Sequence, residues 1–380
     1  MLKELKVESI MSQDFAEITS DERVSKLVSL FKGSRDVVVV KEDNKYSGVI
    51  SKKDLIRSTN KPGSTKIKKI TRASPKLSKS TDLAEVARLM IENNMANLPV
   101  FENEVVVGMV KIDDILKTLE KSSFDVKAKD IMTKEPVTLK QDDSVIKALI
   151  TCRDHNISRI MITKGDDLIG LISLHDIITP KMLAPTKGLT EHHIIDEKNS
   201  AFDMQIKNLM TTDVFTVPDS ASVNDLIKEM FSKDISSLVV AEHQKPLGII
   251  TKKDILEAVL YESKKSDDEV VIQVASKVNV NRTLVIEEIS DFVRKNKKEL
   301  GPGYINAHIT KHKETLRDKH LLHCRLRIRC KQQYDVSSEG YGEEYMMKEA
   351  FRKLKSQMLK ENRKKLTPEE VYEYTNTSAL

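Results

Sequence analysis

At four places in this chain a short apolar run begins with glycine and ends at a polar residue, and an aspartate follows three residues after that polar residue. A hydroxyl there can reach a phosphate or a ribose, a helix N-terminus offers free backbone N–H groups, and a carboxylate can accept both ribose hydroxyls. The same spacing also suits a helix cap, whether or not a ligand binds. The pairs are Ser51/Asp54, Lys111/Asp114, Ser173/Asp176 and Thr251/Asp254, and the second lacks the hydroxyl.

The elements that must position these pairs recur four times. An apolar quartet at i, i+3, i+4 and i+7, the pattern of a one-sided helix, precedes each glycine by 24 or 25 residues, with a short β-rich run between them. A residue suited to N-capping stands three places before each quartet. The quartets begin at Val24, Leu83, Val145 and Val223, the predicted caps are Asp21, Ser80, Asp142 and Ser220, and the glycines are Gly48, Gly108, Gly170 and Gly248.

Each repeat is therefore predicted to fold as strand, helix, strand, strand, helix. A unit of about 50–55 residues buries too little apolar surface to be secure alone, so we expect the repeats to pair. Between the third and fourth repeats, extra residues that include His192 and His193 favour an exposed linker over a metal site. The predicted segments are repeats at 8–60, 65–120, 126–180 and 205–262, a linker or loop at 181–204, a basic domain at 269–366 and a tail at 367–380.

Residues 8–259 resemble the cystathionine-β-synthase (CBS) module. The resemblance rests on leading segments such as Ile131-Met132-Thr133 and Leu209-Met210-Thr211, and on strands such as Gly170-Leu171-Ile172-Ser173. It implies two Bateman pairs, an α/β fold of βαββα repeats, and an adenine nucleotide (AMP, ADP or ATP) as a regulatory ligand, with no cofactor required. The residues implied are Ser51, Asp54, Asp114, Ser173, Asp176, Thr251 and Asp254. A purely structural body is the alternative.

Charge separates the C-terminal part from the rest. Residues 1–269 have a net charge of −2, whereas residues 270–366 have +10, which favours a polyanionic partner. In the segment Leu321–Cys330, apolar residues alternate with one histidine and three arginines, so one sheet face is predicted to be basic. The predicted order is β-α-β-β-β-α, an α+β domain with both helices on one face.

This domain is predicted to bind RNA by backbone charge and shape, because three basic elements distant in sequence occur together and no tryptophan is present. An arginine row alone is equally typical of a solvated strand face. In the last helix, predicted from Glu343 to about Lys365, Leu359 is expected to pack inward. The candidate RNA-binding residues are His323, Arg325, Arg327, Arg329, Lys353, Lys355, Lys360 and Arg363.

Residues 270–365 resemble the bacterial hibernation promoting factor and ribosome-associated inhibitor family. The element order agrees, and Ser338-Glu339-Gly340 matches the family's small residue, Glu and Gly before the last helix. The resemblance implies binding in the decoding channel of the small ribosomal subunit, against its rRNA. One departure is the position of the domain, which in bacterial members comes first.

We therefore expect a ribosome-binding translation inhibitor whose CBS body senses a nucleotide. The alternative is a nucleotide-responsive RNA-binding regulator unconnected to ribosomes. An enzyme is not expected, because no nucleophile–base set, glycine-rich phosphate loop or metal-ligand cluster occurs, and no helix-turn-helix spacing favours a transcription regulator. With no apolar run of eighteen residues and no secretion signal, we expect a cytoplasmic protein without membrane contact, in which CBS modules offer a homodimer interface.

Overall fold

The structure, a computed structural model, consists of two compact units, Met1–Met90 with Met95–Leu260, and Ile91–Asn94 with Tyr261–Leu380. We call the four repeats the repeat body and the part from Val270 onward the C-terminal domain. Nearly all of the predicted linker, with His192 and His193, and the whole tail lie outside the described residues. The structure describes residues 2–31, 37–52, 54, 65–120, 122, 124–134, 136–155, 157–177, 204–262, 270–276, 280–316 and 319–365.

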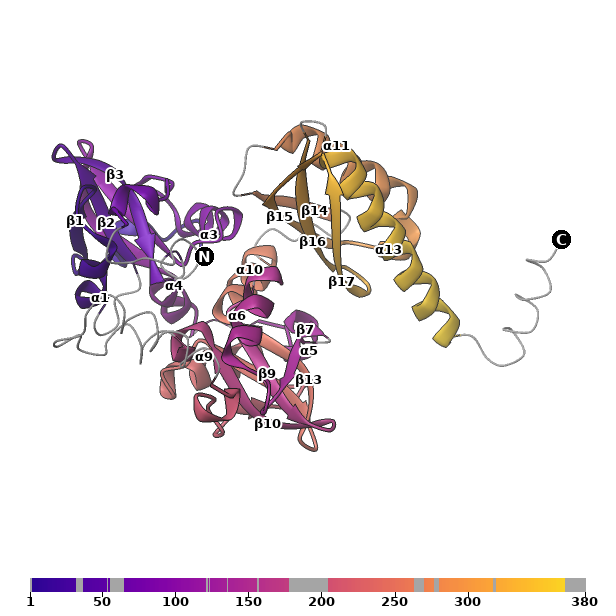
Figure 1. Cartoon of the computed structure of the whole chain (residues 1–380). Coiled ribbons are helices and arrows are strands. Elements are labelled where there is room, and N and C mark those ends of the chain that lie inside the picture. The colour runs from indigo at the N-terminus through magenta and orange to yellow at the C-terminus, as the bar shows by residue number, and fades with distance from the viewer. Residues whose placement is uncertain are drawn as a thin grey trace. The chain divides into compact units, whose positions relative to one another are not determined.

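Each repeat contains a short strand, a helix and a β-hairpin (Figure 1). The short strand is parallel to the middle strand, which pairs antiparallel with the third. Repeats 1 and 2 contain, in turn, β1 Ala16–Thr19, η2 Val24–Lys26, α1 Leu27–Leu30, β2 Val37–Glu42 and β3 Lys45–Ser51, and then β4 Leu77–Ser78, α3 Leu83–Glu92, β5 Asn97–Glu102, β6 Val105–Lys111 and α4 Ile112–Leu119. Repeat 3 contains β8 Thr138–Lys140, α6 Val145–Asp154, β9 Arg159–Lys164 and β10 Asp167–Ser173. Repeat 4 contains β11 Thr216–Val217, α9 Val223–Ser232, β12 Ser237–Glu242, β13 Lys245–Thr251 and α10 Lys252–Glu262.

In repeats 2, 3 and 4 the apolar quartets form the buried sides of the first helices, as predicted, but the helix caps lie elsewhere. The prediction placed the cap of α9 at Ser220, whereas Ser222 is the N-cap and accepts from the backbone N–H of Asp225. In the second repeat, Asp82 rather than Ser80 accepts the N–H of Glu85 at 2.8 Å. The cap must directly precede the first helical residue, and that residue is the first member of the quartet.

The repeat glycines lie inside the hairpins and do not open the second strands. Each is the fourth residue of its strand, next to a shift in register. In three hairpins the two turn residues both have positive φ, for example Asp43 at 49° and Asn44 at 61°. Such turns match the twist of the paired strands, so the strand starts at the turn, three residues before the glycine.

The glycines are required by the way in which the repeats pair. A Cβ at Gly248 would lie 2.8 Å from both the Met132 sulfur and the Thr133 carbonyl oxygen, which belong to the leading segment of repeat 3. Gly170 is covered in return by Met210 and Thr211 of repeat 4. Gly48 and Gly108 make the equivalent exchange with the leading segments of repeats 2 and 1. The repeats therefore pair reciprocally, first with second and third with fourth.

Short helical turns carry these leading segments, and backbone pairing with the partner repeat follows, as a short strand in one case and as isolated β-bridges in the others. β7 (Thr133–Lys134) adds to the sheet of repeat 4, with Thr133 opposite Ile249. In the first pair, the backbones of Ser12 and Met109 exchange two hydrogen bonds of 2.9 and 2.8 Å. The remaining leading elements are η1 Val7–Ser9, η3 Ile67–Lys69, α5 Ala128–Ile131 and η4 Ile206–Asn208.

The C-terminal domain has the predicted β-α-β-β-β-α order, with one additional short helix. Its sheet has the order β14-β15-β16-β17, with β14 parallel to β15 and the other pairs antiparallel. The elements are β14 Val270–Ser276, α11 Arg282–Lys295, α12 Lys297–Leu300, β15 Gly303–Leu316, β16 Lys319–Arg329, β17 Gln333–Tyr341 and α13 Glu343–Lys365.

One apolar layer joins α11 and α13 to a single face of this sheet (Figure 1). The rings of Phe292 and Phe351 stack at 4.6 Å between the two helices. On β16, Cys324, Leu326 and Ile328 face this core, as their alternation predicted. Leu359 was predicted to pack and is instead 60% exposed, because the buried stripe of α13 runs through Leu354 and Met358. No described helix is both long and apolar enough to cross a membrane.

Candidate functional site

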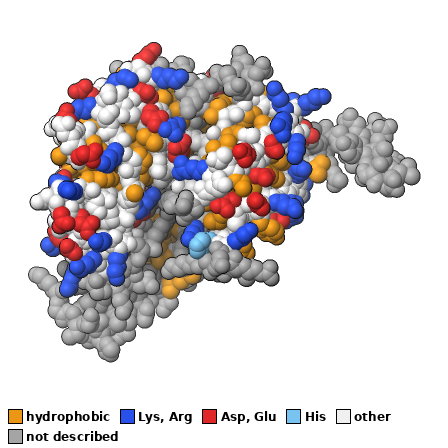
Figure 2. Space-filling view, turned by 90° about the horizontal axis from the view of Figure 1, so that it is seen from above, with side chains coloured by type: hydrophobic (Ala, Val, Ile, Leu, Met, Phe, Trp, Pro, Cys, Tyr) orange, Lys and Arg blue, Asp and Glu red, His pale blue; other side chains and the backbone are white. Residues whose placement is uncertain are grey.

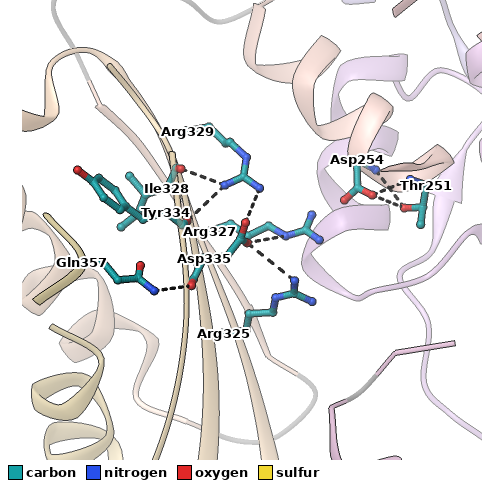
Figure 3. A network of polar contacts seen from close by, with 9 residues as sticks. All are labelled: Thr251, Asp254, Arg325, Arg327, Ile328, Arg329, Tyr334, Asp335 and Gln357. Carbon is teal, nitrogen blue, oxygen red and sulfur yellow. Dashed lines mark hydrogen bonds and ion pairs between the residues drawn. The ribbon is translucent and has the colours of Figure 1, made fainter. Parts of the chain in front are cut away.

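In every repeat the candidate aspartate closes the cap of a helix. Thr251 donates its backbone N–H and its hydroxyl to one carboxylate oxygen of Asp254, both at 2.7 Å (Figure 3). Ser173 makes the same two bonds to Asp176, at 2.8 and 2.7 Å. The returning bond, from the aspartate N–H to the hydroxyl oxygen, is 3.4 Å at Asp254 and 3.2 Å at Asp176. These are reciprocal capping boxes.

Repeats 1 and 2 show that the aspartate caps the helix with or without a hydroxyl three residues before it. Ser51 and Asp54 reproduce all three bonds, at 2.9, 2.6 and 3.3 Å. Lys111 has no hydroxyl, yet its backbone N–H still donates to Asp114 at 2.9 Å. Burial raises the pKa of the Asp114 carboxyl, while the bond from Lys111 opposes that shift. Helix capping therefore accounts for the aspartate in all four repeats, and for the hydroxyl in the three repeats that carry one.

The four carboxylates differ in how far they remain open to a ligand. Asp254 is 3% exposed and Asp54 is 6% exposed. The second oxygen of Asp54 forms an ion pair of 3.0 Å with Arg72, from the leading segment of repeat 2. Asp114 and Asp176 are partly exposed. Among the complete hydroxyl–aspartate pairs, Ser173/Asp176 thus leaves the most carboxylate surface for a ribose.

Lys252 connects the fourth candidate site with the second. It follows Thr251 directly, and its ammonium pairs with Asp113, the neighbour of Asp114, at 2.9 Å. The same ammonium lies 5.0 Å from the centre of the Phe231 ring. Neither this pair nor Arg72 was singled out from the sequence, because their partners lie in other repeats.

The arginine row of β16 lies on the sheet face opposite the helices. Arg325, Arg327 and Arg329 converge on one carboxylate, Asp335 of β17 (Figure 3). Their nitrogens lie 3.9, 3.6 and 2.8 Å from its oxygens, in that order. Cross-strand register explains the arrangement, since Asp335 stands directly opposite Arg327. The three arginines thus share one face, as predicted, and the carboxylate of Asp335 lies between them.

Two basic side chains on this face of β16, Arg329 and His323, are almost fully buried. Arg329 is 6% exposed because its guanidinium folds back, donating to the Ile328 and Tyr334 carbonyl oxygens at 3.1 and 3.3 Å as well as to Asp335. His323 is 9% exposed, between Thr310 and Glu339 on the neighbouring strands. Both predicted RNA-binding side chains therefore offer little open surface on this face.

Side chains of α13 reach the edge strand β17 that carries Asp335. Lys353 donates to the Ser337 carbonyl oxygen at 2.7 Å, and Gln357 donates to the Asp335 carbonyl oxygen at 3.4 Å. Lys355 and Lys360 are exposed, whereas the side chain of Arg363 lies outside the described residues. Figure 2 shows Lys and Arg side chains distributed over the visible face of the molecule among Asp and Glu side chains. The cations of β16 and α13 therefore flank one strand.

The described residues offer no alternative chemistry of the metal-dependent kind. No group of three or more His, Cys, Asp or Glu side chains comes together there as a metal site would require. Cys324 and Cys330 are free thiols, and burial raises the pKa of each to about 12. Both are therefore neutral and poor nucleophiles at neutral pH.

The repeated fold and the paired leading segments define a class of protein. The chain belongs to the CBS-domain family, whose model matches residues 7–60, 67–121, 128–180 and 206–261. Residues 269–376 match a second model, the C-terminal domain of the hibernation factor Hib. Both resemblances drawn from the motifs are thereby confirmed at the level of domains.

Relatives extend over part of the chain. An uncharacterized protein of Methanocaldococcus jannaschii is 27% identical over 261 residues, covering 67% of this chain and 61% of the relative. A protein of Thermofilum pendens is 28% identical over 181 residues, covering 46% of this chain and 58% of the relative. The chain thus spans about three fifths of the length of these relatives.

A solved structure shares the fold of the repeat body. It is a Methanocaldococcus jannaschii protein described as an archaeal homologue of γ-AMPK, with a TM-score of 0.60 and 17% identity. The match covers 67% of this chain and all of that one.

Proposed function

We propose that this protein is a ribosome hibernation factor whose C-terminal domain binds the rRNA of the small subunit in the decoding channel. The match of residues 269–376 to the Hib C-terminal domain carries the proposal. Arg325 and Arg327 retain partial exposure on a face with no helices, where guanidinium groups can pair with phosphates. The Thermofilum pendens relative is named for its place in a ribosomal RNA operon, which agrees with a ribosomal role.

A bound domain in that channel would occlude mRNA and tRNA, so the subunit would be idle. The protein would act in the cytoplasm and without catalysis. Asp335 keeps the guanidinium groups of Arg325 and Arg327 on one surface, which limits the entropy lost when they engage RNA. Arg329, which is buried and donates to the Ile328 and Tyr334 carbonyl oxygens, would support this surface from beneath.

We further propose that the repeat body binds an adenine nucleotide and that Ser173/Asp176 is the principal site. The support is the partial exposure of Asp176, compared with the buried Asp254 and the Arg72-paired Asp54. A nucleotide would regulate ribosome binding only through unequal affinity for two arrangements of the chain.

Sedimentation tests the ribosomal role. Extracts of starved cells should show the protein in the small-subunit, monosome or dimer fractions. Replacing Arg325 and Arg327 together by alanine should release it, whereas alanine at Arg23 and Arg88 of the repeat body should not. If the unmodified protein stays at the top of the gradient while still binding RNA in vitro, it is an RNA-binding regulator unconnected to ribosomes.

Calorimetry with AMP, ADP and ATP tests the nucleotide site. Asp176→Asn should abolish the strongest binding signal. Asp225→Asn is a matched control, because Asp225 closes an identical serine capping box on α9, where Ser222 donates its hydroxyl at 2.6 Å. Equal loss in both variants would trace the effect to the cap, and full binding by Asp176→Asn would exclude this site.

A further inference from the structure

A second group of cations lies at the end of the C-terminal domain where β16 turns into β17. Four of them follow each other closely, from the last turn of α11 into α12, and the fifth occupies the hairpin turn. All five side chains are exposed. We call this group the hairpin-end patch, and it comprises Arg294, Lys295, Lys297, Lys298 and Lys331.

Backbone contacts bring the two segments together. α12 ends at Leu300, whose carbonyl oxygen accepts the N–H of Lys331 at 2.9 Å. Gly301 follows with φ of 66°, a conformation that glycine adopts without strain. A Cβ at Gly301 would lie 3.3 Å from the Cβ of Lys331, so the lysine rests against the end of α12. The patch is therefore a fixed feature of the fold.

The patch carries a clear excess of positive charge. Its five cations are accompanied within residues 291–299 by two carboxylates, Asp291 and Glu299. Asp291 pairs with Arg294 at 2.8 Å. Within the described part of the chain, no ion pair joins Lys295, Lys297, Lys298 or Lys331 to another side chain. These four ammonium groups remain in water, where they can exchange counterions for phosphates.

The patch also continues the arginine row. Lys331 comes two residues after Arg329, so the cations of β16 run along the sheet face and pass around the hairpin turn to the helix layer. A single strand of RNA would follow one of these surfaces. Cations on both sides of one end suit phosphates from two strands. No aromatic side chain interrupts the run from Arg294 to Lys298, which disfavours base stacking.

We infer that the hairpin-end patch is a second RNA-binding surface of the C-terminal domain, which takes the phosphate backbone of duplex RNA. The inference rests on the proposed function and deepens it. The arginine row and the patch together would hold a structured RNA helix, and neither would read its sequence.

The test uses the full-length chain with a labelled RNA duplex, a labelled oligouridine strand and purified small ribosomal subunits. Lys→Gln at positions 295, 297, 298 and 331 should weaken duplex and subunit binding at least tenfold. The slope of log affinity against log salt should fall by about 0.9 for each lost phosphate contact. Lys→Arg at the same positions should preserve binding, which separates loss of charge from loss of folding. The matched control replaces four exposed lysines of the repeat body by glutamine, at Lys129, Lys134, Lys140 and Lys228.

Three results would overturn the inference, and the third would overturn the proposed function with it. If affinity and salt slope are unchanged while Arg325→Ala/Arg327→Ala abolishes binding, the patch is not an RNA surface and the proposed function stands. If oligouridine binding falls as much as duplex binding, the assignment to duplex RNA is wrong. If neither the patch variant nor the arginine variant changes binding to RNA or to subunits, the proposed function itself fails.

Discussion

Replacing Asp335 by asparagine should destabilise the C-terminal domain more than any other single loss of a carboxylate there. The substitution keeps the shape of the side chain but leaves Arg325, Arg327 and Arg329 without their shared anion. At 2.8 Å and an effective dielectric constant of about 20, the Asp335–Arg329 attraction alone is roughly 6 kcal/mol. Desolvation of the two groups offsets part of this attraction, and removing one partner of a buried pair costs about 3–5 kcal/mol.

The Asp335 side chain retains 16% of its exposure, so the lower end of that range applies, about 3 kcal/mol. For a domain of about a hundred residues, a loss of 3 kcal/mol lowers the melting temperature by roughly 12–24 °C. Calorimetry on the full chain should show one transition moving while the transition of the repeat body stays in place. Added salt should reduce the difference in melting temperature between Asp335→Asn and the unmodified chain, because it screens the repulsion among the arginines.

Glu339→Gln is the matched control, since Glu339 is an exposed carboxylate on the same strand and the same face. It should change stability by less than about 0.5 kcal/mol. If Asp335→Asn proves as mild as Glu339→Gln, the convergence of the arginines on Asp335 contributes nothing to folding and the reasoning is refuted.

Three further predictions concern packing, capping and thiol chemistry. Gly48→Ala should lower the free energy of unfolding of the repeat body by about 2–3 kcal/mol, because its Cβ would lie 2.4 Å from the Arg72 carbonyl oxygen, whereas Gly165→Ala, with open space around it but φ of 63°, should cost only about 1 kcal/mol. If Gly48→Ala and Gly165→Ala had equal urea midpoints, the reciprocal pairing of the repeats would be contradicted. Ser222→Ala should cost about 1 kcal/mol and Ser220→Ala almost nothing in the same measurement, and the reverse order would restore the cap predicted from the sequence. Burial raises the pKa of Cys324 to about 12, so at pH 8 roughly one thiol in ten thousand is ionised; iodoacetamide should modify it only after unfolding, as mass spectrometry would show, and rapid labelling of the folded chain would contradict this.

Local periodicity predicted the main helices and strands of this protein, but not the short elements α12 and β7. The helix quartets and the alternation on β16 depend only on neighbouring residues, so the buried sides of α9 and of β16 followed from the sequence. The caps were misplaced by two residues because several serines and aspartates near each helix start are equally suited to capping. Only the backbone hydrogen bonds distinguish Ser222 from Ser220.

The candidate sites were less predictable because they depend on contacts between distant segments. Nothing near Asp54 in the sequence indicates that Arg72 will pair with it. Asp335 lies only six residues from Arg329, but the residue types do not give the hairpin register that brings the two together. The residue types were therefore identified, but their accessibility was not. For Arg325 and Arg327 the prediction of a shared face was correct, while the anion at its centre was missed.

The exchange between each glycine and the leading segment of the partner repeat has a consequence for shortening this protein. Met210 covers Gly170, and Met132 covers Gly248. Cutting the chain between repeats 3 and 4 would therefore expose the glycine backbone and an apolar methionine side chain on both fragments. The unit that can be deleted, transplanted or duplicated cleanly is the couple, about 110 residues with both partners present. Truncations designed around a single module should yield insoluble material, whereas those that respect the couple should not.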